Sequence, residues 1–182
     1  MMSLIQKFDI CILTFINNNM HYPIMDKAMV IVTSLGNMGI IWIIISIILI
    51  VNKKYRNIGI MVLGALLLST ILGEVCLKPL VHRLRPFSDN SSVKLLIARP
   101  ISFSFPSGHT TSSFAAAGIL AKYFKNYAPC IFFFAALIAF SRLYLYVHYP
   151  TDVLAGVILG LVCSKIIIYI FSKIQSLKSF SK

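Results

Sequence analysis

Long apolar stretches alternate along the chain with short polar segments. A helix needs about 20 mostly apolar residues to cross a bilayer. By that measure the pattern predicts five membrane-spanning helices, at residues 28–51, 57–77, 107–121, 127–146 and 151–173. The first of these has a weak point (a soft centre) at residues 36–39, where glycine and asparagine interrupt the apolar run and weaken the prediction of a continuous helix. The pattern therefore predicts an all-α polytopic bundle of five to six transmembrane helices.

Residues 4–20 are the sixth candidate, and they admit two interpretations. Lys7, Asp9 and three consecutive asparagines interrupt the apolar run. The segment is either a short helix lying in the membrane interface or a poor first span, and the sequence favours neither. We expect residues 1–27 to form this helix and an outer loop, and residues 28–182 to form one transmembrane domain that carries the chemistry.

Composition agrees with this pattern and excludes other classes of protein. Hydrophobic types make up 58% of the 182 residues and charged types 12%, whereas soluble domains are about 25% charged. The mean hydropathy of +0.87 also excludes intrinsic disorder. We therefore expect an integral membrane protein, and nothing in the pattern indicates its oligomeric state.

The net charge of +12 is distributed unevenly over the two membrane faces. Residues 52–56, residues 122–126 and the C-terminal tail share one face and hold nine basic residues, so that face should be cytoplasmic. The opposite face holds seven more, which are Lys27, Lys78, Arg83, Arg85, Lys94, Arg99 and Arg142. Because that number exceeds what topology requires, we expect an anionic ligand there and no nucleic acid.

Three short segments on that face carry reactive side chains. They are residues 78–86 (KPLVHRLRP), residues 104–109 (SFPSGH) and residues 141–152 (SRLYLYVHYPTD). A loop joins the first two, and two predicted spans separate the second from the third. All three therefore return to the same face, where one site could gather them.

The residue types in these segments suit a phosphate group. Lys78, Arg85 and Arg142 supply three cations, and the planar fork of each arginine matches phosphate oxygens. Pro106 suits the first turn of a helix, so the amides of residues 107–109 should face an anion at the positive end of that helix. Glu74 lies four residues before Lys78, which predicts an ion pair between them.

Two histidines complete the pattern for phosphoryl transfer. Asp152 lies four residues after His148 and can hold one of its ring nitrogens, which leaves the other free to attack. His109 can stand opposite and protonate the departing oxygen. Because no acidic cluster is available for Mg²⁺, we predict a mechanism without a metal or another cofactor.

The three motifs K-x6-R-P, P-S-G-H and S-R-x5-H-x3-D, in this order, resemble the signature of the type 2 phosphatidic acid phosphatase (PAP2) superfamily. That superfamily includes vanadium haloperoxidases and bacterial undecaprenyl-diphosphate phosphatases. The resemblance runs from Lys78 to Asp152, with Arg83-Leu84-Arg85-Pro86 where many members have R-P-R-P. It implies a helix bundle of the PAP2/haloperoxidase type. The residues that it implies are His148 as nucleophile through a phosphohistidine, Asp152 as its partner, His109 as general acid, and Lys78, Arg85, Ser107, Gly108 and Arg142 as phosphate ligands.

The apolar composition favours a lipid phosphate over a soluble halide as substrate. The resemblance alone points first to undecaprenyl diphosphate, with phosphatidate or phosphatidylglycerol phosphate as the alternative. An anionic-lipid flippase or small transporter is a hypothesis of another class. It leaves the two histidines and the aspartate unexplained.

Other polar and aromatic residues are expected to be structural. His21 and His82 lack neighbours of catalytic type. We expect Tyr144, Tyr146 and Tyr149 to form an aromatic belt at the membrane interface.

Overall fold

The computed structural model describes residues 3–89, 93 and 95–180, and every regular element in these ranges is a helix. The predicted all-α class is therefore confirmed. The helices are α1 (Leu4–Asn19), α2 (Pro23–Leu35), η1 (Asn37–Gly39), α3 (Ile40–Val51), α4 (Arg56–Thr70), η2 (Ile71–Leu77), α5 (Lys78–Val81), α6 (Pro86–Asp89), α7 (Gly108–Tyr123), η3 (Lys125–Tyr127), α8 (Ala128–Tyr144) and α9 (Pro150–Phe180).

The apolar helices agree in position with the predicted spans. Within the described ranges, three are long and apolar enough to cross a membrane, namely Arg56–Ser88, Lys125–Tyr144 and Pro150–Leu177. The pair α2 and α3 makes a fourth if the two count as one bent span. Helix α7, with 16 residues, is shorter. The predicted number of five spans stays a prediction.

The soft centre predicted in the first span is a break in the helix. The axes of α2 and α3 differ by 47° across residues 36–39. Met38 and Gly39 both adopt left-handed backbone conformations, with φ of 51° and 69°. Since this conformation cannot continue a right-handed helix, the chain turns here and places η1 beside the end of α7.

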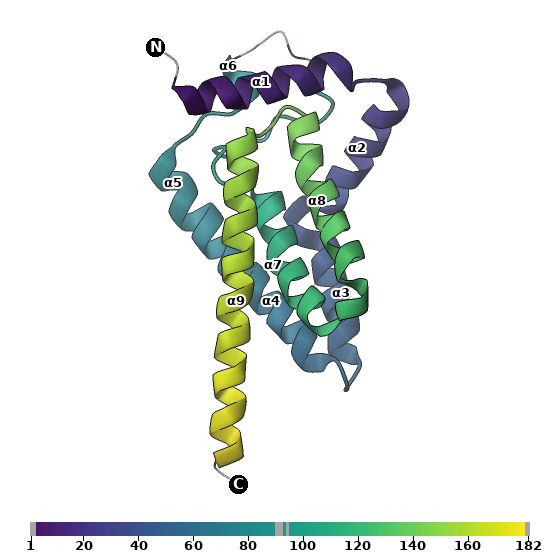
Figure 1. The fold of residues 1–182 in the computed structure, drawn as a ribbon, viewed down its shortest axis with the longest axis vertical. Helices are drawn as coiled ribbons and strands as arrows, with labels where there is room; N and C mark the ends of the chain where they lie inside the picture. The colour runs from purple at the N-terminus through teal and green to yellow at the C-terminus, as the bar shows by residue number, and fades with distance from the viewer. Residues whose placement is uncertain (1–2, 90–92, 94, 181–182) are drawn as a thin grey trace.

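Helix α7 lies at the centre of the bundle and packs against α4, α8 and α9 (Figure 1). Small residues allow this close approach. Ala115, Ala116 and Ala117 are fully buried. On α9, a Cβ added at Gly160 would stand 2.5 Å from the carbonyl oxygen of Thr111, so only glycine fits there.

Helix α1 lies across the end of the bundle, over the junction of α8 and α9 (Figure 1). Asp9, Leu13 and Ile16 face inward and are buried, whereas Leu4, Ile5, Phe8 and Phe15 are exposed. Of the two interpretations left open by the sequence, this placement fits a helix in the membrane interface. The predicted boundary between residues 27 and 28 falls inside α2, and the division itself stays a prediction.

The three motif segments come together at the end of the bundle that α1 covers. The turn at residues 52–55 and the end of α9 lie at the opposite end (Figure 1). The tyrosines of the third segment do not form the predicted interfacial belt. Tyr144, Tyr146 and Tyr149 are buried beneath α1 and α2, where Tyr144 donates a hydrogen bond of 2.6 Å to Asp26. That prediction is wrong because α1 covers the surface the tyrosines would have occupied.

Candidate active site

A cavity of about 910 Å³ opens where the three motif segments meet. It combines positive charge with two imidazoles and one glycine at a helix start. The predicted site residues that line it are Lys78, Arg85, Gly108, His109, Arg142 and His148. The even number of spans predicted between the second and third motif segments thus correctly placed Lys78 and His148, which are 70 positions apart, in one site.

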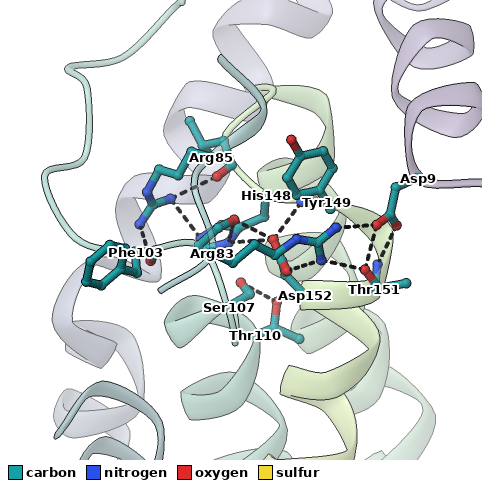
Figure 2. A network of polar contacts seen from close by, with 12 residues as sticks. Asp9, Arg83, Arg85, Phe103, Ser107, Thr110, His148, Tyr149, Thr151 and Asp152 are labelled. Atoms are coloured by element: carbon teal, nitrogen blue, oxygen red, sulfur yellow. Dashed lines mark hydrogen bonds and ion pairs between the residues drawn. The ribbon is translucent and has the colours of Figure 1, made fainter. Parts of the chain in front are cut away.

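Arg85 holds the nucleophile candidate in a defined tautomer. Its Nη1 donates to the carbonyl oxygen of Val147 at 2.8 Å and lies 3.1 Å from Nε2 of His148 (Figure 2). Its Nε donates to the carbonyl oxygen of Ser102 at 2.7 Å. Because a guanidinium can only donate, Nε2 must accept, and the proton of a neutral ring lies on Nδ1.

The partner of Nδ1 differs in detail from the prediction. Asp152 Oδ2 lies 3.7 Å from Nδ1 of His148, which is too long for a direct hydrogen bond. Ser104 lies between them: its hydroxyl donates to Asp152 Oδ2, and its oxygen is 3.4 Å from Nδ1. The backbone N–H of Tyr149 also donates to Oδ2, at 2.9 Å. Burial lowers the pKa of His148 to about 3, so the ring is neutral at physiological pH.

His109 stands on the wall of the same cavity, at the start of α7. Its Nε2 lies 2.9 Å from Oδ1 of Asn37, which belongs to the break between α2 and α3. The break in the first span therefore gives the second imidazole its partner.

The carboxylate of Glu74 binds Lys78 and lies close to the backbone of Gly108. Lys78 Nζ donates to Glu74 Oε2 at 2.8 Å, so the predicted ion pair is present, and it also donates to Ser102 Oγ at 3.1 Å. A Cβ added at Gly108 would stand 2.3 Å from Glu74 Oε1. A side chain at this position would displace the carboxylate that holds Lys78, so glycine leaves this ion pair in place.

The surroundings of Arg142 are those expected of a residue that binds an anion. The side chain is buried, and its Nη1 donates to Thr33 Oγ1. Its Nε has no hydrogen-bond partner among the described residues. Buried donors are nearly always paired, so an unpaired guanidinium nitrogen on a cavity wall fits a phosphate oxygen as its partner.

Ser107 departs from the predicted arrangement. Its backbone N–H donates to the carbonyl oxygen of Asp152 at 3.1 Å, so the prediction that this amide faces an anion is wrong. Its hydroxyl oxygen accepts from Thr110 at 2.9 Å, and the residue is fully buried behind the cavity wall (Figure 2). Ser107 instead ties the start of α7 to the start of α9, because the helix begins at Gly108 and not at Pro106.

The structure brings to the site several residues for which the sequence predicts no role. Arg83 Nη1 donates to Asp152 Oδ1 at 2.6 Å, and its Nη2 donates to Asp9 Oδ2 at 2.5 Å (Figure 2). Ser104 and Asn37 contact the two histidines. The signal that could have found Asp9 is its position as a carboxylate inside an apolar run, because such a charge needs a partner.

The remaining histidines lie outside the cavity lining, as expected for structural residues. His21 Nδ1 lies 2.8 Å from Asp26 Oδ1, and the ring of His82 packs against Phe103 with 4.6 Å between centroids. Of the other basic residues that the sequence places on this face, Arg99 lies over the ring of Phe87, and Lys94 lies outside the described residues.

Comparison with known proteins agrees with this geometry. The family model of the PAP2 superfamily matches residues 58–176. An undecaprenyl-diphosphatase from Sulfolobus acidocaldarius is 32% identical over 154 residues, which are 84% of this chain and 73% of that relative.

Two solved structures share the fold over most of their length. The crystal structure of Aquifex aeolicus LpxE superposes with a TM-score of 0.78 and 29% identity, and the match covers 88% of this chain and 94% of that one. The transmembrane PAP2-type phosphatidylglycerolphosphate phosphatase from Bacillus subtilis superposes with a TM-score of 0.75 and 27% identity, covering 95% and 89%. The family match extends over more than half of the chain and includes all three motif segments, so the chain belongs to the PAP2 superfamily.

Proposed function

We propose that this protein removes the terminal phosphate of undecaprenyl diphosphate, through a phosphohistidine at His148 and on the extracytoplasmic face of the membrane. Its family and its relatives make it a multi-pass membrane protein and a phosphatase of lipid phosphates. The observation that carries the proposal is the cavity in which three cations and two imidazoles meet, with Arg142 Nε unpaired among the described residues.

The proposed first step is attack by Nε2 of His148 on the terminal phosphorus. Lys78, Arg85 and Arg142 bind the oxygens of that phosphate, and Arg85 transfers its hydrogen bond from Nε2 to the phosphate. The lone pair of Nε2 is then free and forms the N–P bond. The P–O bond to the lipid phosphate breaks, and His109 gives its proton to the departing oxygen.

The second step returns the enzyme to its starting state. Neutral His109 accepts a proton from a water molecule, whose oxygen attacks the phosphohistidine and breaks the N–P bond. The products are inorganic phosphate, the lipid monophosphate and free His148. Asp152, through Ser104, stabilises the positive charge that His148 carries while phosphorylated.

Undecaprenyl diphosphate is the first choice because the Sulfolobus relative bears that activity in its name. Phosphatidylglycerol phosphate is the alternative, because the Bacillus subtilis structure is a phosphatase for it. In either case the apolar tail stays in the bilayer while the headgroup enters the cavity. The excess of basic residues at the other end of the bundle supports an outward-facing site.

The test is phosphate release by the protein purified in detergent, with EDTA present and each lipid supplied separately. We expect release from undecaprenyl diphosphate, none from the His148→Ala variant, and a loss of about 10²–10⁴-fold in the His109→Ala variant. A strict Mg²⁺ requirement, or no release from any lipid, contradicts the proposal. Release in detergent also distinguishes an enzyme from a flippase, which needs a sealed membrane.

A further inference from the structure

Arg83 lies between two buried carboxylates, and both of its terminal nitrogens donate hydrogen bonds. Nη1 donates to Asp152 Oδ1 at 2.6 Å and to Thr151 Oγ1 at 2.7 Å, while Nη2 donates to Asp9 Oδ2 at 2.5 Å (Figure 2). Its guanidinium carbon lies 4.0 Å from the ring centroid of Tyr149. Arg83 is not among the residues that line the cavity, and both of its terminal nitrogens are engaged by protein groups.

Asp9 connects this arginine to the helix that covers the site. Its side chain is fully buried, and it accepts from the backbone N–H of Thr151 at 3.0 Å and from Thr151 Oγ1 at 2.7 Å. Burying a carboxylate costs several kcal/mol unless it is well paired, and an apolar residue would attach α1 to the bundle at lower cost. The presence of a buried carboxylate at position 9 is therefore best explained by its electrostatic interaction with Arg83.

The two oxygens of Asp152 have different partners. Oδ2 accepts from Ser104 and from the N–H of Tyr149, and it faces Nδ1 of His148. Oδ1 accepts from Arg83. When His148 becomes cationic during the reaction, an unbalanced Arg83 would oppose the new charge through Asp152. Asp9 supplies the second negative charge, so two carboxylates balance one guanidinium and one imidazolium.

We propose that Asp9 and Arg83 are positioning residues for His148 and Asp152: Arg83 fixes the Asp152 carboxylate, and Asp9 on α1 neutralises Arg83 so that Asp152 keeps its negative charge for His148. Helix α1, which carries Asp9, then contributes to the reaction through the charge of Asp152 and does more than cover the end of the bundle. This inference rests on the proposed phosphatase function.

The test compares kcat and KM for phosphate release among charge variants at this junction. Asp9→Asn keeps the shape of the side chain but leaves Arg83 unbalanced, so kcat should fall about 10- to 100-fold with KM unchanged. Lys7→Gln changes one charge on an exposed part of the same helix and should match the wild type. Equal kcat values for Asp9→Asn and the wild type contradict the inference and leave the proposed function intact.

A double variant separates charge balance from simple helix attachment. Arg83→Met removes the cation that Asp9 balances, so Asp9→Asn combined with Arg83→Met should recover kcat relative to Asp9→Asn alone. A purely structural role predicts that the double variant is at least as impaired as either single variant, and that result overturns the inference.

A conservative variant covers the case in which Asp9→Asn does not yield folded protein. Arg83→Lys keeps the positive charge and should retain a higher kcat than Arg83→Met, whereas equal kcat values contradict the inference. Thermal unfolding of each purified variant identifies the folded fraction. If the wild type itself releases no phosphate, the proposed function is wrong and this inference falls with it.

Discussion

Burial and hydrogen bonding set both the charge and the tautomer of His148. The side chain is 2% exposed, and Arg85 donates toward its Nε2. A free histidine has a pKa of about 6.5, whereas burial lowers the pKa of His148 to about 3. The ring therefore keeps the lone pair that a nucleophile needs at physiological pH.

This pKa predicts that acidification from pH 7 to pH 5 leaves His148 neutral. The unfolded chain binds that proton below about pH 6.5 and the folded chain does not, so acidification also favours unfolding through this group. The measurement is a pH titration of histidine ring resonances by NMR on isotope-labelled protein, in which the signal missing from the His148→Ala variant identifies the residue. A midpoint near 6.5 for that signal contradicts the prediction.

The residues whose chemistry is local to a motif could be predicted from the sequence. The two histidines and the cations Lys78, Arg85 and Arg142 line one cavity as expected. What the sequence could not supply is which individual side chains of distant segments pair with one another. Asp9 and Arg83 are 74 positions apart, and no periodicity relates them.

The wrong predictions share a physical origin. The sequence predicts an anion at the amide of Ser107 because it places Pro106 inside the helix, but α7 begins at Gly108, and the carbonyl oxygen of Asp152 accepts from that amide. The sequence also predicts an aromatic belt of Tyr144, Tyr146 and Tyr149 at the membrane interface. In both cases a neighbouring element, α9 or α1, occupies the space that sequence reasoning left open.

At the scale of elements, the junction of α7 and α9 aligns the site. Helix α7 carries His109, and α9 begins two residues after His148. Gly160 allows the two helices to approach, since a Cβ there would stand 2.5 Å from a backbone oxygen that cannot rotate away. The sequence indicated both helices correctly, but the closeness of their contact depends on where the glycines of one helix face the backbone of the other.

Gly160→Ala should therefore push α9 away from α7. We expect destabilisation of about 1–3 kcal/mol, typical of overpacking, together with a lower kcat, because His109 lies on α7 and His148 lies two residues before α9. The control is Gly64→Ala on α4, where the new Cβ would meet Ile167 at an ordinary 3.5 Å. Thermal unfolding in detergent and phosphate release measure the two effects. Equal behaviour of the two variants would show that this contact is not tight.

At the scale of the whole molecule, the bundle has two chemically different ends. The cavity, α1 and α6 lie at one end, and the turn at residues 52–55 lies at the other (Figure 1). The sequence predicted correctly that the motif segments and the turn at residues 52–55 lie at opposite ends, because that prediction requires only a count of the apolar runs between them. The assignment of the cavity end to the outside depends on the positive-inside bias and stays a prediction.

Cysteine labelling of intact bacterial cells checks that orientation. The starting protein has serine in place of its exposed cysteines, Cys11, Cys76 and Cys130. Ser88→Cys places an exposed thiol on α6 at the cavity end, and Lys54→Cys places one in the exposed turn at the other end. A maleimide that cannot cross membranes should label the first variant in intact cells and the second only after permeabilisation, because the nine basic residues of the second end favour the cytoplasm. The reverse pattern would place the cavity in the cytoplasm, and a lipid diphosphate presented at the outer leaflet would then be out of its reach.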